Sequence, residues 1–320
     1  MGISRNEALE CFQSDDLIGI GMEADAVRRR LHPEGVVSYA IETAINLREQ
    51  NATGEASIEE LCAAIGETVE RGSTGVRLHG GIEIEKTEGV LRGIRKNFPA
   101  LWIEGPSATE IVALAAGCGR AVRETIARLG DAGLDSITRD DAQTQCSPGC
   151  CSTAEWIAVH RAAHGLGMRT VATLRFGAGE TMQQRVDFLA AVRQLQEETG
   201  GFAAFVPVAA EAASGRELDA VTAVEQLKTL AVARIFLDNI ENIQWSGAEQ
   251  GLKVLQMGLR FGANDAGSVT PQGIGAGAVF GENAAAATNH ATEEDIRRII
   301  RDAGFQPVQR DIPYRMMFLN

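Results

Sequence analysis

The feature that most constrains the fold is a regular alternation of apolar, strand-like segments with capped helical segments. Because each strand is followed by a helix, the repeat predicts parallel strands with the helices packed outside them. Eight repeats predict a (β/α)8 barrel of the TIM type, in the α/β class. An open, doubly wound sheet is the alternative, but no G-x-G-x-x-G pattern follows the first strand. The predicted strands are residues 36–46, 75–81, 101–105, 134–137, 169–176, 202–208, 243–246 and 261–267.

The predicted barrel accounts for most, but not all, of the 320 residues. Residues 1–35 hold two short helical patterns, which cannot fold alone and are expected to pack on the barrel. Residues 36–270 form the barrel. Residues 271–320 form a C-terminal extension, with a helix and a tail strand, that is expected to pack on it.

Charge and hydropathy exclude two classes of partner. The formal net charge of −13 argues against nucleic acid, whose phosphates require a basic face. No apolar stretch approaches the ~20 residues that a membrane-spanning helix needs. The first residues lack the apolar segment of a signal peptide, so a cytoplasmic location is expected.

Several segments together resemble one family. They are RRRLHPEGVVSY (28–39), RLGDAGLDSI (128–137), HGLGMRTVATLRFG (164–177), QLQEETGGFAAFVP (194–207), ARIFLDNIENIQ (233–244) and GLRFGANDAGS (258–268). They are similar to the radical S-adenosylmethionine (SAM) enzymes of the futalosine route to menaquinone. The similarity is above all to cyclic dehypoxanthinyl futalosine synthase, with aminofutalosine synthase as its sister. The resemblance covers nearly the whole chain and implies a barrel of the radical SAM kind.

The sequence departs from the family pattern in the two segments that would hold the cofactors. The family carries a Cys-x3-Cys-x2-Cys loop after its first strand, and three thiolates there hold a 4Fe–4S cluster. Residues 46–55 contain no cysteine, and the loop is shortened. After the fourth strand, Asp140 and Asp141 stand where the family has a glycine-rich turn near SAM. The resemblance therefore implies a degenerate member, in which both the 4Fe–4S cluster and SAM are expected to be absent.

A cysteine-rich motif, CSPGCC, offers a weak alternative metal site at Cys146, Cys150 and Cys151. Two of the three ligands would be adjacent residues whose side chains diverge, which fits one metal ion poorly. Reactive thiols and plain loop residues are the other interpretations, and no metal is the expectation. His160 and His164 have the helical spacing of a metal pair, but an outer helix predicts that they lie on the surface.

The substrate side of the barrel is better preserved. Because catalytic groups follow the strands of such barrels, polar residues at the predicted strand ends are the candidates. Asp265, Glu180 and His79 are candidate acid–base groups, with a turn, a helix cap and a structural histidine as their respective alternatives. The predicted substrate-binding set is His79, Gly80, Gly81, Glu104, Arg175, Glu180, Gln250, Asn264 and Asp265.

Two functional hypotheses follow. The first is a pseudoenzyme without the cluster, which binds a small molecule and pairs with an active radical SAM paralogue or with a second copy of itself. The second is an enzyme of different, acid–base or metal-assisted, chemistry on a futalosine-like or other nucleoside-derived molecule. The carboxylates of Glu104, Asp140, Asp141, Glu180 and Asp265 would serve that second function.

Overall fold

The computed structural model describes residues 2–47, 58–80, 83–138, 151–210, 221–246, 251–271 and 291–317. Two helices, α1 (Arg5–Gln13) and α2 (Leu17–Leu31), precede the first strand. The remaining elements in chain order are β1 (Val36–Asn46), α4 (Ile58–Glu70), β2 (Gly75–His79), α5 (Ile84–Asn97), β3 (Trp102–Glu104), α6 (Ala108–Cys118), α7 (Val122–Asp131), α8 (Thr153–His164), β4 (Thr170–Phe176), α9 (Met182–Thr199), β5 (Phe202–Ala209), α10 (Ala223–Phe236), β6 (Asn242–Ile243), α12 (Leu252–Gly258), β7 (Asp265–Val269), α13 (Glu293–Asp302) and β8 (Gln306–Gln309).

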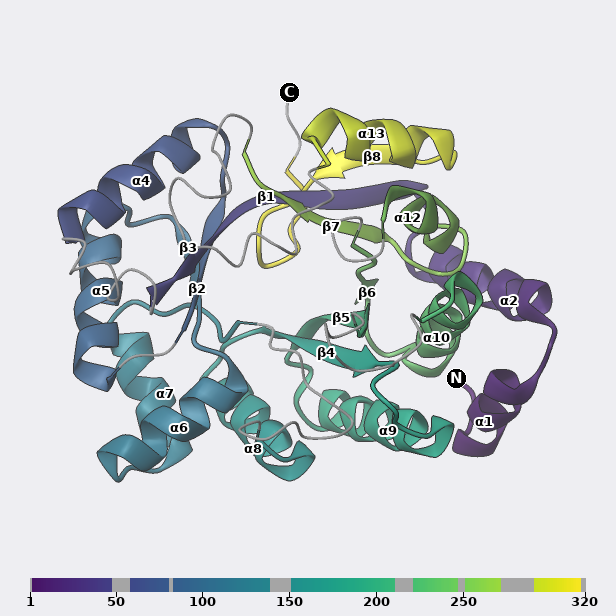
Figure 1. Cartoon of the computed structure of the whole chain (residues 1–320), viewed down its shortest axis with the longest axis horizontal. Helices are drawn as coiled ribbons and strands as arrows, with labels where there is room; N and C mark the ends of the chain where they lie inside the picture. Colours follow the sequence, from purple (N-terminus) through teal and green to yellow (C-terminus); the bar gives the residue numbers. More distant parts are fainter. Residues whose placement is uncertain are drawn as a thin grey trace.

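The strands are parallel and form a ring with helices outside it (Figure 1). One sheet has the order β3-β2-β1-β7 and the other the order β4-β5-β6. A bridge between Gln244 and Asp265 joins the two sheets on one side. On the other side, Ser136 forms a bridge to Glu104 and donates its hydroxyl to the Arg169 carbonyl. The predicted strand at 134–137 is thus reduced to the single bridge at Ser136.

The last barrel strand differs from its prediction. The pattern at 261–267 predicts a strand that ends near Asp265, whereas β7 begins at Asp265. The reason lies in the preceding turn: the amides of Phe261 and Ala263 both donate to the Gly258 carbonyl, which prolongs the end of α12. Gly262, with φ 105°, then turns the chain into the strand. Asp265 consequently lies at the N-terminal end of β7 rather than at its C-terminal end.

Helix starts follow the capping signals of the sequence. Ser107 caps α6 and forms a reciprocal capping box with Glu110, as predicted. Ser152 and Thr181 cap α8 and α9 in the same way. These caps satisfy the orphan amides at the point where each helix leaves a barrel loop.

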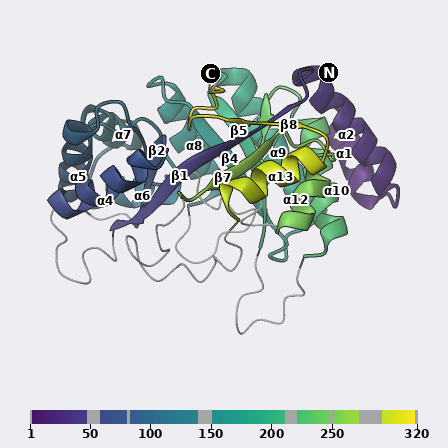
Figure 2. The same cartoon turned by 90° about the horizontal axis from the view of Figure 1, so that it is seen from above.

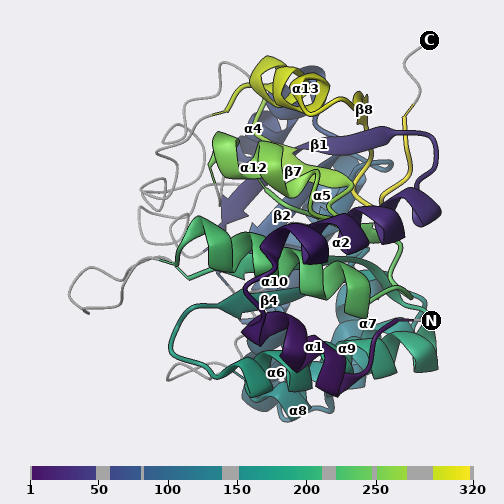
Figure 3. The same ribbon diagram turned by 90° about the vertical axis from the view of Figure 1, so that its right-hand side faces the viewer.

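The N-terminal helices lie against the outside of the barrel, where α2 packs along α10 and α1 along α9 (Figure 3). The apolar core is the layer between strands and helices, with Phe176, Phe202 and Trp245 among its fully buried side chains. No helix in the described ranges has the length and apolar character needed to cross a membrane.

The C-terminal extension adds a further parallel strand. β8 pairs with the first four residues of β1, while β2 pairs with its last five on the same edge. Beyond β8 the chain folds back, and Arg310 bridges antiparallel to Met316. β8 pairs with β1 where β1 begins, and β1 points away from this end (Figure 2). Ile312, in the segment after β8, lies next to Gly75, the first residue of β2. The fold-back segment, residues 310–317, therefore lies at the N-terminal end of the barrel.

Candidate functional site

Strand alternation gives the barrel a polar interior. Ala172, Leu174 and Phe176 of β4 belong to the outer core, so Thr173 and Arg175 face the other side. The same argument applies to β1 and β2, whose interior-facing residues include charged side chains. Polar contacts inside the barrel fall into two groups, one near the strand starts and one nearer the strand ends.

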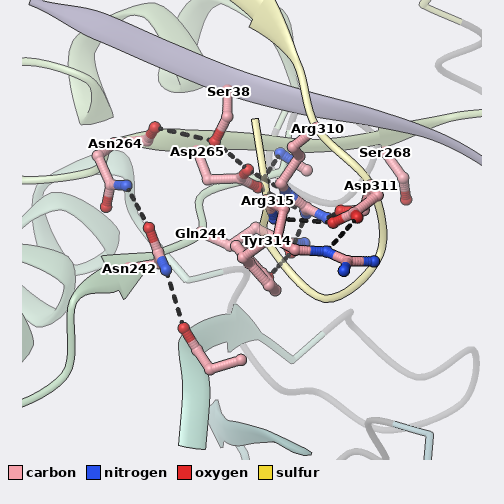
Figure 4. Close-up of polar contacts among 12 residues, drawn as sticks. Ser38, Asn242, Gln244, Asn264, Asp265, Ser268, Arg310, Asp311, Tyr314 and Arg315 are labelled. Atoms are coloured by element: carbon pink, nitrogen blue, oxygen red, sulfur yellow. Dashed lines mark hydrogen bonds and ion pairs between the residues drawn. The ribbon is translucent and has the colours of Figure 1, made fainter. Parts of the chain in front are cut away.

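The first group, the floor cluster, comprises Ser38, Gln244, Asp265, Arg310 and Tyr314 (Figure 4). Arg310 donates to both carboxylate oxygens of Asp265, from Nε at 2.5 Å and from Nη2 at 3.0 Å. Ser38 Oγ donates to Asp265 Oδ2 at 2.6 Å. Asp265 is fully buried. Burial alone would lower the pKa of Arg310, but the Asp265 carboxylate raises it overall.

Asn264 lies between strands rather than at the mouth. Its Oδ1 accepts from Arg234 Nη2 at 2.6 Å and from the Ile243 amide at 2.8 Å. Its Nδ2 donates to Asn242 Oδ1, as Figure 4 shows. Arg234 is fully buried and also donates to three backbone carbonyls. Every polar atom of the Asn264 side chain is engaged, so its geometry favours an architectural role between β6 and β7. The predicted position of Asn264 and Asp265 at the mouth is wrong, because β7 starts where the pattern predicts its end.

The second group, the upper cluster, comprises Glu42, Arg77, Glu104 and Ser268. The Arg77 guanidinium donates to Glu42, and its Nε lies 3.6 Å from Glu104 Oε2. Ser268 Oγ donates to Glu42 Oε1 at 2.5 Å. The two carboxylates are little exposed, at 12% for Glu42 and 10% for Glu104. Only Glu104 of this cluster was predicted. A charged residue inside an otherwise apolar strand is the signal that identifies Glu42 and Arg77.

The other predicted site residues are more dispersed. His79 ends β2, and Gly80, with φ 79°, turns the chain directly after it. Arg175 lies one residue before the end of β4, on its interior face. Gly81, Gln250, Asp140 and Asp141 lie outside the described residues.

Glu180 stabilises the loop between β4 and α9. Its carboxylate accepts from the amides of Gly177 and Ala178 at 2.7 and 2.9 Å, and from Arg185 Nε at 2.6 Å. Arg185 continues to Glu225 and Thr229 on α10. Since its oxygens already accept three donors, the geometry favours the structural alternative over substrate binding.

The histidine pair on α8 is not a surface feature. His160 is 1% exposed and packs against Trp156 and Phe202. The expectation of a surface position is therefore wrong for His160, because α8 turns this face toward β4. The Thr170 hydroxyl lies 2.8 Å from both His160 Nδ1 and His164 Nε2. Burial lowers the pKa of His164 to about 4 and that of His160 well below its usual value.

Comparison with known proteins supplies the family. The model of the CofH/MqnC C-terminal region matches residues 199–319. The cyclic dehypoxanthine futalosine synthase of Streptomyces coelicolor is 31% identical, with 99% of this chain and 86% of the relative covered. The chain belongs to the radical SAM futalosine family.

Two further relatives and one solved structure are also similar to this chain. The aminodeoxyfutalosine synthase of Thermus thermophilus is 28% identical over 98% of this chain and 92% of its own length. A Methanosarcina barkeri 5-amino-6-(D-ribitylamino)uracil–L-tyrosine 4-hydroxyphenyl transferase is 31% identical over 81% of this chain and 72% of its own. Methylornithine synthase has the same fold, with a TM-score of 0.67 at 14% identity, covering 96% of this chain and 94% of its own.

The cysteines in the described ranges do not fit an iron–sulfur cluster of the futalosine family. Cys62 lies on α4, where its thiol donates to the Gly93 carbonyl, and Cys118 ends α6 with its thiol on the Ala115 carbonyl. Cys11 is on α1, and Cys151 contacts Thr109. Within the described residues, no three Cys, His, Asp or Glu side chains are grouped to hold a metal ion. Cys146 and Cys150 lie outside those residues.

Proposed function

We propose that this futalosine-family barrel has lost radical chemistry and serves as a small-molecule-binding protein linked to menaquinone biosynthesis. The observation that carries the proposal is the lack of cysteine in the sequence that follows β1. The sequence has no cysteine between Cys11 and Cys62, so the connection from β1 to α4 offers no thiolate to a 4Fe–4S cluster. SAM, which binds such a cluster, has no anchor there either.

The polar interior supports the binding half of the proposal. A barrel that had kept only its architecture would be free to fill its interior with packed apolar side chains, as TIM barrels commonly do. Here the Arg77 guanidinium instead contacts both the Glu42 and the Glu104 carboxylates. Partly buried charges of this kind are costly to keep, and a ligand-binding site is a physical reason to keep them.

Two measurements test the proposal. Protein reconstituted anaerobically with iron and sulfide is expected to hold only substoichiometric iron. Calorimetric titration with cyclic dehypoxanthine futalosine and with aminodeoxyfutalosine, the compounds for which the relatives are named, is expected to show saturable binding of one of them. Stoichiometric iron, or no binding of either compound, contradicts the proposal. Association with an active paralogue or a second copy stays a prediction, to be checked by co-purification and by measuring solution mass.

A second candidate function is acid–base catalysis. It is favoured by the placement of two carboxylates, Glu42 and Glu104, on either side of the Arg77 guanidinium. A carboxylate that a guanidinium holds in place in this way can act as a general base toward a bound molecule. This function is tested by incubating each of the two compounds with the protein and measuring its conversion by mass spectrometry. Conversion that is lost in Glu104→Gln but kept in Glu110→Gln, a capping residue on the outer helix α6, supports it. Unchanged compounds argue for binding alone.

A further inference from the structure

Tyr314 has an unusual backbone conformation. With φ 65°, it is the one non-glycine residue at positive φ within the described ranges. An aromatic residue is strained in this left-handed region, and such strain persists only where the surroundings impose it. Here the Tyr314 hydroxyl reaches into the barrel and donates to Gln244 Oε1 at 2.8 Å, and its ring lies 3.8 Å from the Arg310 guanidinium. The strained residue thus connects the fold-back segment to the floor cluster.

The contact fixes the orientation of the Gln244 amide. Gln244 Oε1 accepts from Tyr314 and from Arg310 Nη2, the latter at 3.4 Å. Two donors on one atom identify it as the oxygen, so the other end of the amide carries two N–H donors. Gln244 is 3% exposed, and its Nε2 has no hydrogen-bond partner among the described residues. A buried donor without a partner is expensive, which points to a bound group that accepts from it.

A second unpartnered group lies on the same face of the sheet. Thr173 is 2% exposed, and its Oγ1 also has no partner within the described part of the chain. Thr173 pairs with Val206 in the β4–β5 register, and the Gln244 amide donates to the Phe205 carbonyl. Thr173 and Gln244 therefore flank Val206 on the interior side of three adjacent strands.

The chemistry of these groups limits the ligand. An amide N–H and a hydroxyl are both suited to an acceptor oxygen, and Val206 provides apolar surface between them. The nearby charges, Asp265 and Arg310, neutralise each other within one ion pair. A carboxylate brought here would lose its hydration without gaining a counter-ion. The groups suit a neutral acceptor, the carbonyl oxygen of an amide or a ring.

We propose that Gln244 and Thr173 form a carbonyl-binding subsite on the floor of the barrel, and that Tyr314 is the positioning residue that holds Gln244 in its donating orientation. The inference rests on the proposed function, because it assigns the part of the ligand that reaches the floor. It also makes residues 310–317 a part of the ligand site.

The positioning role has a spectroscopic test that needs no ligand. Protein labelled with 15N at glutamine gives side-chain amide signals, and the Gln244 pair is the one absent in Gln244→Glu. Tyr314→Phe keeps the ring on Arg310 but removes the donor, so the Gln244 signals are expected to shift. Tyr39→Phe is the matched control, because Tyr39 donates its hydroxyl to Glu293 on the outer helix α13. Gln244 signals that stay in place in Tyr314→Phe overturn the positioning role.

The subsite is tested by titration with cyclic dehypoxanthine futalosine and aminodeoxyfutalosine. Loss of the buried donor in Gln244→Glu is expected to weaken binding about tenfold or more. Thr173→Val and Tyr314→Phe are expected to weaken it several-fold, and Tyr39→Phe to leave it unchanged, at similar melting temperatures. Wild-type binding that persists in Gln244→Glu and Thr173→Val overturns the subsite alone. No wild-type binding overturns the proposed function and the subsite with it, while the amide signals still decide the positioning role.

Discussion

At the scale of single residues, the structure gives Asp265 a different role from the one that the sequence predicts. In the sequence, an aspartate near a predicted strand end is a candidate base. In the structure it is a fully buried partner of Arg310, and its two oxygens accept from four donors: Ser38, the Gly267 amide and two nitrogens of Arg310. A carboxylate so engaged is unsuited to accept a substrate proton.

Asp265→Asn is therefore expected to act on stability first. The substitution leaves the Arg310 charge buried without its counter-ion, which is expected to cost about 3–5 kcal/mol of unfolding free energy. Asp311→Asn is the control. Asp311 pairs with Arg315, whose side chain is 75% exposed, so a loss below about 1 kcal/mol is expected. Urea unfolding measures both. A stable Asp265→Asn protein that has lost only ligand binding or turnover contradicts the structural role.

At the scale of elements, the sequence predicts order and type well and strand ends less well. β1 has the predicted bounds, because its apolar run is closed by glycine before it and polar residues after it. β7 is misplaced because the apolar pattern does not reveal that residues 261–263 continue the end of α12. Arg234, which is distant in sequence, also donates to the Gly262 carbonyl of this turn. The upper cluster was missed for a similar reason: only the register brings Glu42, Arg77 and Glu104 together.

The contact between α8 and β4 predicts how stability responds to acid. The folded pKa of His164 is lowered to about 4 from 6.5, and that of His160 is lowered as well. Between these pH values the unfolded chain binds more protons than the folded one. The contribution of the two histidines to the unfolding free energy is therefore fully present above about pH 6.5. Below that pH the unfolding free energy falls by up to about 1.4 kcal/mol per pH unit for each histidine.

The histidine prediction is checked by urea unfolding at several pH values between 4 and 7. His164→Gln keeps one donor and one acceptor for Thr199 and Thr170 but does not titrate. Its unfolding free energy is expected to fall less steeply with acid than that of the wild type. Equal slopes for the two proteins would show that the pair does not titrate as its burial implies.

At the scale of the whole molecule, similarity to the family extends along the chain, although no cysteine lies between Cys11 and Cys62. Similarity to the Streptomyces coelicolor relative spans 99% of this chain, and the fold matches methylornithine synthase over 96% of it. If radical chemistry was lost with one loop, the rest of the barrel should still accept that loop. β1 ends at Asn46 and α4 begins at Ile58, so both anchor points of the loop are defined.

This reasoning predicts the outcome of a graft. Residues 48–57 are replaced by a loop with the Cys-x3-Cys-x2-Cys pattern that the family resemblance implies, and the protein is reconstituted anaerobically. Iron is expected to rise from a substoichiometric level to about four per chain, the content of one 4Fe–4S cluster. The same graft with its three cysteines changed to alanine controls for adventitious iron, and the melting temperature controls for folding. A folded graft without iron would mean that the barrel beyond this loop has also lost the capacity to hold the cluster. Iron binding by the ungrafted chain would place the thiolates elsewhere and refute the proposed loss of the cluster.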